Sequence, residues 1–292
     1  MSSPSSTEEF EARRSLLFTV AYEMLGSAAD AEDVVQESWL QWAVVDHEQV
    51  RDPRAFLIRI VTRQALNRMR TLARRRESYV GEWLPEPLLT TPDVADDVEF
   101  AESVSIAMLT VLETLSPTER AVFVLREVFA VPYGEIAEAL DKTPAAVRQI
   151  ARRARGHVEA RRPRIRVSRA EQEEVVERFL AAIQTGDVDG LLGVLAPDVV
   201  AVGDGGGLAP AARLPIEGAQ RVARSLLLVA RTDGLSVHPM WVNGALGISI
   251  EHDGKVRAVA SVRVEGGRVI ALYGVNNPEK LTRLDRETQL AI

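Results

Sequence analysis

Arginine side chains at helical spacing are the first feature of this sequence that could do chemistry. They lie in EALDKTPAAVRQIARRAR, residues 138–155, of a chain whose formal net charge is −7. Apolar residues recur here at i, i+3, i+4 and i+7, which predicts one buried helical stripe: Val147, Ile150, Ala151 and Ala154. The outer faces then carry Ala145, Arg148, Gln149, Arg152, Arg153 and Arg155. Guanidinium groups on an exposed helix face can bind phosphates or base edges of nucleic acid.

A short helix and a tight turn precede this basic helix. Apolar residues between 136 and 140 predict the shorter helix, and Asp141-Lys142 leaves room only for a turn. Thr143 can cap the basic helix, with Pro144 in the first turn, where a missing N–H costs nothing. This order is typical of a helix-turn-helix that binds the major groove of DNA. An ordinary helical corner with a solvated basic face is the alternative.

Composition excludes several classes of site. The chain has 292 residues, a length that predicts two or three domains. It contains no cysteine, which excludes disulfides and thiolate metal sites, and its four histidines show no metal-ligand spacing. No apolar run reaches the ~18 residues of a membrane span, and the first residues lack a secretion signal. We therefore expect a cytoplasmic protein without a membrane segment, a metal site or another cofactor.

Charge is arranged in blocks along the chain. Residues 51–80 hold nine basic and two acidic side chains, and residues 116–165 hold ten basic and six acidic ones. Residues 81–115, between them, hold eight acidic side chains and no basic one. Two separated basic blocks predict two contacts with a polyanion, because phosphate contacts dominate affinity for nucleic acid.

Residues 8–78 predict a helical domain. Its second helix presents acidic and polar side chains on one surface, and we expect Asp30 to cap that helix. Asp52-Pro53 begins a long third helix. The outer faces of this third helix carry Arg54, Arg59, Arg63, Arg68 and Arg70.

Residues 79–100 contain three prolines and many acidic residues, which predicts a linker rather than a helix. Its WLPEPLL stretch is more apolar than a flexible spacer, so we expect the linker to dock onto another part of the protein. Residues 101–163 predict a second helical domain, with a capping box at Ser116-Pro117-Thr118-Glu119 ahead of the helix-turn-helix.

The basic run RRPRIR, residues 161–166, leads into a third segment, residues 170–292, of different character. Its first part predicts helices over 170–183 and 188–195, and a later helix over 217–231. Period-two patterns predict strands over 199–202, 235–242, 245–251, 257–265 and 269–275. Turn signals at residues 252–255 and at Gly266-Gly267 join consecutive strands. The segment is therefore predicted to be an α+β domain with a curved antiparallel sheet.

Residues 8–163 resemble the extracytoplasmic-function (ECF) sigma factors of bacterial RNA polymerase. Three stretches carry the resemblance: DAEDVVQESWLQW, DPRAFLIRIVTRQALNRMRTLARRR, and LSPTERAVFVLREVFAVPYGEIAEALDKTPAAVRQIARRAR. They resemble the polymerase-binding helix, the helix that melts and reads the minus-ten promoter element, and the domain that reads the minus-thirty-five element. The resemblance implies two all-α domains, the second a helix-turn-helix, with core polymerase (β′ and β subunits) and promoter DNA as partners.

The resemblance also implies site residues. Contacts to core polymerase are expected from Asp33, Gln36, Glu37 and Leu40. Minus-ten contacts are expected from Arg54, Arg59, Arg63, Asn67 and Arg70. Minus-thirty-five contacts are expected from Thr143, Ala145, Arg148, Gln149, Arg152, Arg153 and Arg155.

The third segment resembles SnoaL-like domains of the NTF2-like fold, a cone of helices on a curved sheet, on the stretch FLAAIQTGDVDGLLGVLAPDVV. Sigma factors with such a domain form a subgroup, often called SigJ-like. Its hallmarks predict an interdomain regulatory contact between WLPEP (Trp83, Leu84, Pro85, Glu86, Pro87), DGGG (Asp204, Gly205, Gly206, Gly207) and NPEKL (Asn277, Pro278, Glu279, Lys280, Leu281). The lysine that usually follows DGGG is replaced by Leu208, so an ion pair from that position is absent.

Two functions follow from these patterns. The first is a promoter-recognition subunit whose fused third domain regulates it without a separate anti-sigma factor; the direction of that regulation stays open, as does a small-molecule ligand in the third domain. The alternative is a DNA-binding module fused to a SnoaL-like isomerase or hydrolase, in which His238 or Asp204 would do acid–base chemistry. The sequence shows no paired carboxylates and no nucleophile with a base, so we expect no catalytic residues.

Overall fold

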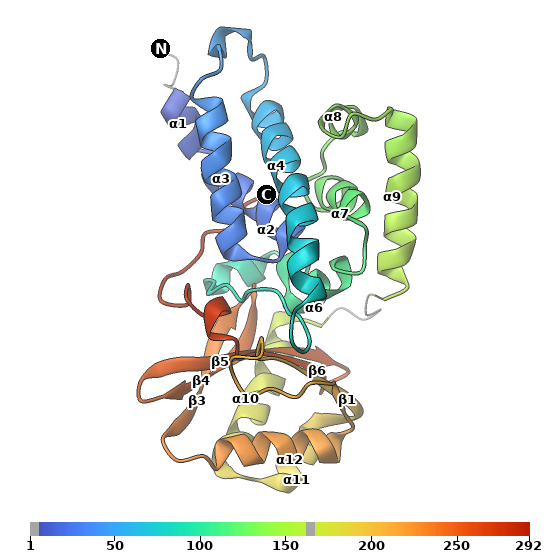
Figure 1. Cartoon of the computed structure of the whole chain (residues 1–292). Helices are drawn as coiled ribbons and strands as arrows, with labels where there is room; N and C mark the ends of the chain where they lie inside the picture. Colours follow the sequence, from blue (N-terminus) through green and yellow to red (C-terminus); the bar gives the residue numbers. More distant parts are fainter. Residues whose placement is uncertain (1–5, 162–166) are drawn as a thin grey trace. The chain divides into compact units, whose positions relative to one another are not determined.

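The computed structural model describes residues 6–161 and 167–292, apart from the side chains of residues 74–76. The chain folds into two compact units. The helical unit comprises residues 1–77, residues 111–162 and the last four residues; the mixed unit comprises residues 78–110 and 163–288 (Figure 1). Most of the basic run, residues 162–166, lies outside the described residues.

Four helices form the first part of the helical unit. They are α1 (Ser6–Glu11), α2 (Arg14–Leu25), α3 (Ala28–Trp42) and α4 (Pro53–Glu77), with a 3-10 turn at His47–Gln49. Asp52 Oδ1 accepts a hydrogen bond from the Ala55 N–H at 3.0 Å, so α4 begins where Asp52-Pro53 predicts it. The buried faces of α2, α3 and α4 meet at Leu17, Val34 and Val61, each 0% exposed.

The expected cap of α3 was wrong. Ser27, not Asp30, is the N-cap: its hydroxyl accepts from the Asp30 N–H at 3.2 Å. Ser27 has an extended backbone (φ −132°, ψ 122°), whereas Asp30 already lies in the first helical turn. The Asp30 carboxylate is therefore left for another partner.

The second part of the helical unit contains the helix-turn-helix. Its elements are α7 (Pro117–Phe123), a π-helical turn (Val124–Val128), α8 (Tyr133–Ala139) and α9 (Pro144–Glu159). The capping box of α7 is confirmed, with Ser116 and Glu119 bonding each other's backbone N–H. Thr143 is confirmed as the N-cap of α9, since its hydroxyl accepts from the Ala146 N–H at 3.2 Å.

One buried arginine joins α7 to α2. Arg120 is 1% exposed; its Nε donates to the Glu23 carbonyl oxygen at 2.9 Å, and another guanidinium nitrogen donates to Glu113 at 2.7 Å. Burial lowers the pKa of Arg120 to about 9, and the nearby Glu23 carboxylate opposes this shift. The guanidinium thus stays charged at neutral pH and connects the two parts of the helical unit.

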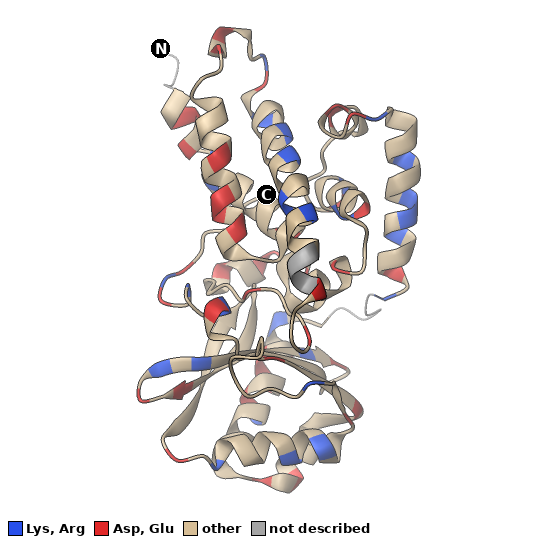
Figure 2. Ribbon diagram, in the orientation of Figure 1, with Lys and Arg blue, Asp and Glu red and all other residues tan. Residues whose placement is uncertain are grey.

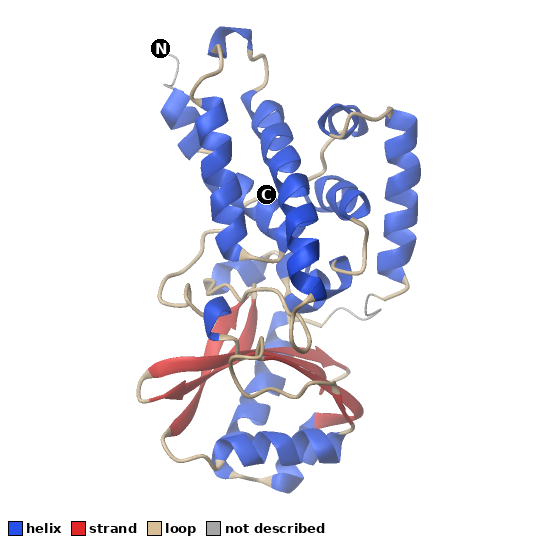
Figure 3. Ribbon diagram, in the orientation of Figure 1, coloured by secondary structure: helices blue, strands red, loops and turns tan. Residues whose placement is uncertain are grey.

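The mixed unit packs helices on one face of a six-stranded sheet (Figure 3). The helices are α10 (Arg169–Thr185), α11 (Val188–Val194) and α12 (Ala219–Ala230). The strands are β1 (Leu195–Asp204), β2 (Ile216–Glu217), β3 (Leu235–Val242), β4 (Ala245–His252), β5 (Lys255–Glu265) and β6 (Arg268–Val275), in the order β2-β1-β6-β5-β4-β3. Phe179, Leu191 and Val222 from the three helices belong to the core that also contains Ile248 and Leu272 of the sheet.

The helix-and-sheet architecture is confirmed, but the sheet is mixed rather than wholly antiparallel. Strands β3 to β6 form the expected antiparallel meander, whereas β1 pairs with β6 in parallel. The direction follows from connectivity, because α12 and four strands separate β1 from β6 in the chain. A parallel pair needs such a long connection.

The linker is extended only in its first half. A 3-10 turn covers Pro92–Asp96 and α5 covers Val98–Val104, so a helix begins before residue 100, contrary to the expectation of a helix-free segment. Asp97 causes this start, because its carboxylate accepts from the N–H groups of Glu99 and Phe100. Helix α6 (Ile106–Leu112) then runs from the mixed unit's part of the chain into the helical unit's part.

The described residues contain neither a membrane-spanning helix nor a cluster of metal ligands. No helix among them is long and apolar enough to cross a membrane. Within the same residues no three His, Asp or Glu side chains gather as a metal site would require.

Candidate functional surfaces

Basic residues recur along α9 (Figure 2), and the face that carries them is exposed along most of its length. All seven residues expected to read the minus-thirty-five element are solvent-exposed, whereas Val147 and Ile150 are buried. Arg148 and Arg152 make no ion pair with any other described residue. The helix therefore presents guanidinium groups that are free to bind an anion.

Two arginines of the same helix are held by carboxylates. Arg155 donates to Glu127 of the π-helical turn at 2.9 Å, which raises the pKa of Arg155. Arg153 lies 3.6 Å from Glu119, whose pKa is lowered first by the Ser116 hydroxyl and then by Arg153. Glu119 thus caps α7 and orients Arg153 at the same time.

The arginines of α4 divide into two groups. Arg63 donates to the carbonyl oxygens of Ala139 at 3.1 Å and Glu138 at 3.2 Å, and to Asp141 Oδ1 at 2.7 Å. Arg59 lies 3.9 Å from the Glu138 carboxylate and stacks on Phe56. These two side chains bind the helix-turn-helix.

The other expected minus-ten residues lie elsewhere on α4. Arg70 donates to the Asn67 side chain at 3.0 Å, and both are exposed. Arg54 is half-buried near the start of the helix. The structure thus spreads the five expected residues along α4 and gives Arg59 and Arg63 intramolecular partners.

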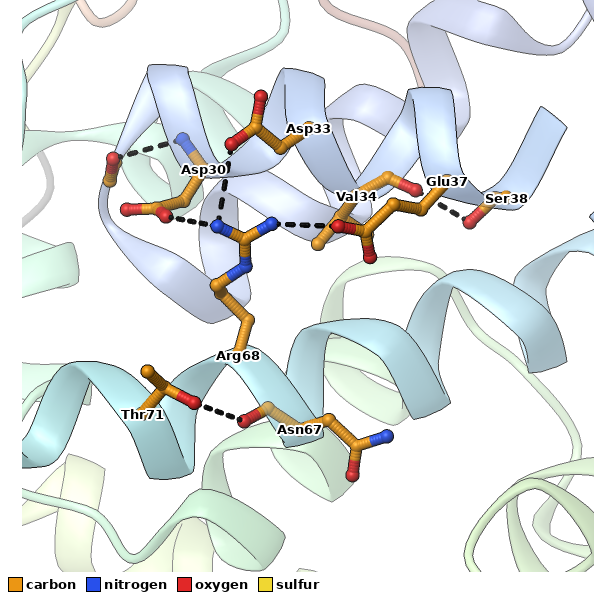
Figure 4. A network of polar contacts seen from close by, with 9 residues as sticks. Asp30, Asp33, Val34, Glu37, Ser38, Asn67, Arg68 and Thr71 are labelled. Carbon is orange, nitrogen blue, oxygen red and sulfur yellow. Dashed lines mark hydrogen bonds and ion pairs between the residues drawn. The ribbon is translucent and has the colours of Figure 1, made fainter. Parts of the chain in front are cut away.

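The acidic face of α3 lies beside α4. Asp33, Gln36, Glu37 and Leu40 are all exposed on one side of α3, and the Leu40 side chain is 62% exposed. Figure 4 shows the Arg68 side chain extending from α4 toward this helix, where it contacts three carboxylates. Its distances are 3.1 Å to Asp30, 3.3 Å to Asp33 and 2.9 Å to Glu37.

Sequence reasoning placed Arg68 only among the arginines of an outer face. The spacing of Asp30, Asp33 and Glu37 at i, i+3 and i+7 marks one acidic stripe, but nothing in the sequence pairs that stripe with α4. One guanidinium group is shared by three carboxylates and leaves the side chains of Asp33 and Glu37 58% and 47% exposed. Both carboxylates are therefore turned toward Arg68 and still reach solvent.

In the mixed unit, Asp204 gathers the residues of the three hallmark motifs. Its carboxylate is 0% exposed and accepts from Lys280 Nζ at 2.7 Å and from the Leu84 N–H at 2.9 Å. Lys280 Nζ also donates to the Leu84 carbonyl oxygen at 2.6 Å and lies 3.3 Å from the centre of the Trp83 ring. WLPEP, DGGG and NPEKL thus meet at one buried ion pair.

Tyr79 is a member of this cluster that sequence reasoning missed. Its hydroxyl donates to Asp204 and accepts from the Asn277 side-chain amide. Burial and the hydrogen bond to Asp204 raise the pKa of Tyr79 well above its usual range. The residue lies four positions before Trp83, outside the quoted motif, and only the contact reveals it.

The glycines of DGGG allow the close approach. Gly206 has a φ of +59°, and a Cβ there would lie 2.3 Å from the Asn277 amide nitrogen and 2.9 Å from the Tyr79 hydroxyl. Gly205 is equally constrained, because its Cβ would lie 2.2 Å from the Ala209 carbonyl oxygen. Leu208, where the resemblance expects a lysine, is 60% exposed, so the ion pair on Asp204 comes from Lys280.

Asn243 is a second residue that sequence reasoning missed. It is 0% exposed, and its side chain accepts from the Leu88 N–H at 2.9 Å and donates to the Val104 carbonyl oxygen at 2.8 Å. Leu89 pairs with Val242, so the linker lies against β3, an outer strand of the sheet. The Asn243-Gly244 dipeptide was the available signal, since it marks a hairpin turn.

The two candidates for acid–base chemistry have different surroundings. The Asp204 oxygens accept hydrogen bonds from Lys280, Leu84 and Tyr79 in a site closed to water. His238 lies on β3 with its ring nitrogen 2.9 Å from the Ser236 hydroxyl, in an exposed position.

Comparisons with known proteins agree with this geometry. The model for Sigma-70 region 2 matches residues 10–75, and the model for Sigma-70 region 4 matches residues 105–158. The sequence is 41% identical over 290 residues to the ECF RNA polymerase sigma factor SigJ of Mycobacterium tuberculosis, covering 94% of this chain and 92% of that protein. It is 29% identical over 281 residues to the probable ECF sigma factor SigI of the same species, covering 95% of each.

A solved structure matches over nearly the whole chain as well. The crystal structure of M. tuberculosis SigJ has a TM-score of 0.76 at 38% identity, and the match covers 95% of this chain and 98% of that one. Both the helical unit and the mixed unit therefore have a counterpart of known structure.

The buried ion pair generates a prediction about stability. Replacing Asp204 by alanine is expected to destabilise the mixed unit by about 3–5 kcal/mol, because Lys280 would stay buried without its carboxylate. Urea unfolding, with amide exchange of linker residues 84–90 as a local probe, measures the change. The matched control is Asp198→Ala on the same strand, where the side chain is exposed. Equal stability of the two variants would contradict this role of Asp204.

Proposed function

Because this chain belongs to the ECF family of RNA polymerase sigma factors, we propose that α3 binds core polymerase and that α4 and α9 bind promoter DNA. We also propose that the third domain regulates both kinds of binding. The family function is promoter-specific initiation by core polymerase. The proposed regulation depends on one observation, the buried Asp204–Lys280 ion pair. Asp204 also accepts a hydrogen bond from Leu84, in the linker that joins the two sigma regions.

Core polymerase binds the acidic face of α3 in this proposal. Asp33, Gln36 and Glu37 offer charge and hydrogen bonds, and the exposed Leu40 offers apolar area beside them. Arg68 orders the two carboxylates in advance, which reduces the entropy lost on binding. A basic surface on the β′ subunit is the complementary partner.

Promoter DNA binds two basic helices. The exposed arginines and Asn67 of α4 take the minus-ten element, where phosphate contacts and captured bases suit a melted strand. Helix α9 enters the major groove at the minus-thirty-five element, with Arg148 and Gln149 near its start reading base edges. Arg152, Arg153 and Arg155 hold phosphates.

The third domain regulates rather than catalyses in this proposal. Twenty linker residues, 78–97, could span about 65 Å if extended. The mixed unit instead holds this segment at Leu84, Leu88 and Thr90, so the two sigma regions are joined by a shorter tether. Restraint of that tether needs no separate anti-sigma factor, and the protein acts in the cytoplasm, where its polymerase is.

The proposed polymerase-binding face of α3 generates a prediction about affinity for core polymerase. The double variant Asp33→Lys/Glu37→Lys is expected to weaken binding to core polymerase by about 100-fold or more, because like charges would then face each other. Biolayer interferometry with purified core enzyme measures it, and circular dichroism checks the fold. Glu11→Lys/Glu48→Lys carries the same change of charge on exposed residues outside the surface and should bind as the parent does. Unchanged binding of the first variant would refute the assignment of α3.

The second prediction separates base readers from phosphate binders on α9. Arg148→Ala is expected to cost about 1–3 kcal/mol on the cognate promoter and little on other sequences. Arg152→Ala should weaken binding to all sequences alike and lower the salt slope by about 1. Holoenzyme binding to promoter and scrambled fragments over a salt series measures both, with Arg257→Ala as the exposed control. A uniform loss for Arg148→Ala would make it a phosphate binder.

The third prediction gives the direction of regulation. A chain ending at Asn276 lacks Asn277 and Lys280, so Tyr79 loses the Asn277 amide, Asp204 loses its buried cation, and the linker is held less firmly at Leu84. We expect this chain to give more run-off transcript with core polymerase than the full chain does. A chain of residues 1–168 shows whether the body of the third domain is itself required. Equal transcript from the full chain and the chain ending at Asn276 would contradict restraint by the linker contact.

A further inference from the structure

The outer face of α12 carries basic and apolar side chains that have no partner in the part of the chain that the structure describes (Figure 2). Arg221 and Arg224 are exposed, and neither makes an ion pair with another described residue. Leu228 follows on the same face and is 73% exposed. The opposite face, with Val222 and Ala223, lies in the core of the mixed unit. Spacing of i, i+3 and i+7 places the two arginines and the leucine on one line along the helix.

Arginine beside an exposed leucine favours a protein as the partner of this face. Arginine is enriched in protein interfaces, where its charge and its long apolar stem both find contacts. The DNA backbone offers phosphates to the arginines but no apolar group to Leu228. A partner that satisfies the whole face therefore carries two carboxylates and an apolar side chain at matching distances.

The acidic face of α3 has this complementary pattern. Asp33, Glu37 and Leu40 are exposed and lie at i, i+4 and i+7. Both sets of three span seven residues, or about 10.5 Å of helix. Two such helices laid side by side and parallel would pair Arg221 with Asp33, Arg224 with Glu37, and Leu228 with Leu40. The middle pair is offset by one residue, about 1.5 Å, which the flexible arginine side chain can span.

The carboxylates of α3 also have room for a second guanidinium group. Arg68 of α4 donates to Asp33 Oδ2 and to Glu37 Oε1, and so uses one oxygen of each carboxylate. A carboxylate accepts hydrogen bonds at both oxygens, so Asp33 Oδ1 and Glu37 Oε2 can accept from another arginine without displacing Arg68. No ion pair joins this face to α12 among the described residues of one chain.

We propose that the outer face of α12 binds the acidic face of α3 on a second copy of this chain. The contact is heterologous, because two different surfaces meet; two copies can exchange both contacts and close into a dimer. One consequence rests on the proposed function: a second copy that covers α3 excludes core polymerase from the same face. Association would then hold the protein in a form that dilution or polymerase dissociates.

Sedimentation equilibrium of the full-length chain tests the association. A small contact of exposed ion pairs and one leucine pair corresponds to a dissociation constant of about 100 µM. The weight-average mass should therefore rise above that of a single chain between about 10 and about 500 µM. Raising the salt from about 0.05 M to about 0.5 M should lower the mass again, because salt screens exposed charges.

Charge reversal on either face should abolish the rise in mass. Arg221→Glu/Arg224→Glu is expected to weaken association at least about ten-fold, because like charges would face each other. Asp33→Lys/Glu37→Lys should weaken it equally, although this change brings the formal net charge from −7 to −3 and so lessens general repulsion between copies. A mixture of the two variants should associate again, since each reversed face then meets its opposite.

A matched control and a cross-link test the position of the contact. Lys255→Glu/Arg257→Glu makes the same change of charge on exposed residues of β5 and should associate as the parent does. The chain has no cysteine, so a disulfide can report which residues meet. Under mild oxidation, a Leu40→Cys copy should cross-link to a tagged Leu228→Cys copy, and not to a tagged Arg257→Cys copy.

The outcomes are separable from those of the proposed function. A constant mass over this range, or association that survives Arg221→Glu/Arg224→Glu, overturns the proposal. A parent that stays monomeric while this variant loses affinity for core polymerase or for a DNA duplex assigns the face to that partner instead. Binding of the parent to core polymerase is measured on the same preparation, and its absence refutes the proposed function of α3 without affecting the association.

Discussion

The buried carboxylate of Asp204 connects separate segments of the mixed unit. Asp204 at the end of β1 accepts hydrogen bonds from Lys280, Leu84 and Tyr79, and each of these comes from a different segment of the chain. A buried charge is stable only when its partners are in place. The linker, the DGGG turn and the NPEKL segment are therefore interdependent, as the proposed regulation of the tether requires.

The arginines of the helical unit fall into four groups. Arg120 is buried and joins α7 to α2, and Arg68 orders the carboxylates of α3. Arg148 and Arg152 stand exposed on α9 without an ion pair in the described chain. Arg63 is exposed and has an ion-pair partner, Asp141, which is itself exposed. Burial sets how much free energy each arginine loses when its partner is removed: much at a buried site and little at an exposed one.

The contacts of the linker and of the helix-turn-helix differ in burial. The mixed unit holds the linker at buried Asp204, and in the helical unit buried Arg120 joins α7 to α2. The Arg63 bonds between α4 and the helix-turn-helix are exposed. Loss of a partner is therefore costly at Asp204 and Arg120 and cheap at Arg63.

The sequence by itself determined the local structure and the family. Capping residues Thr143 and Ser116, the start of α4, the meander of β3 to β6 and the exposed faces of α3 and α9 all follow from spacing and side-chain type, which act over a few residues. Only the tertiary structure decided that β1 runs parallel to β6, that Ser27 caps α3, and that Arg68, Tyr79 and Asn243 belong to the sites. These contacts join residues up to 198 positions apart. No local pattern specifies such pairs, because they depend on how whole elements pack.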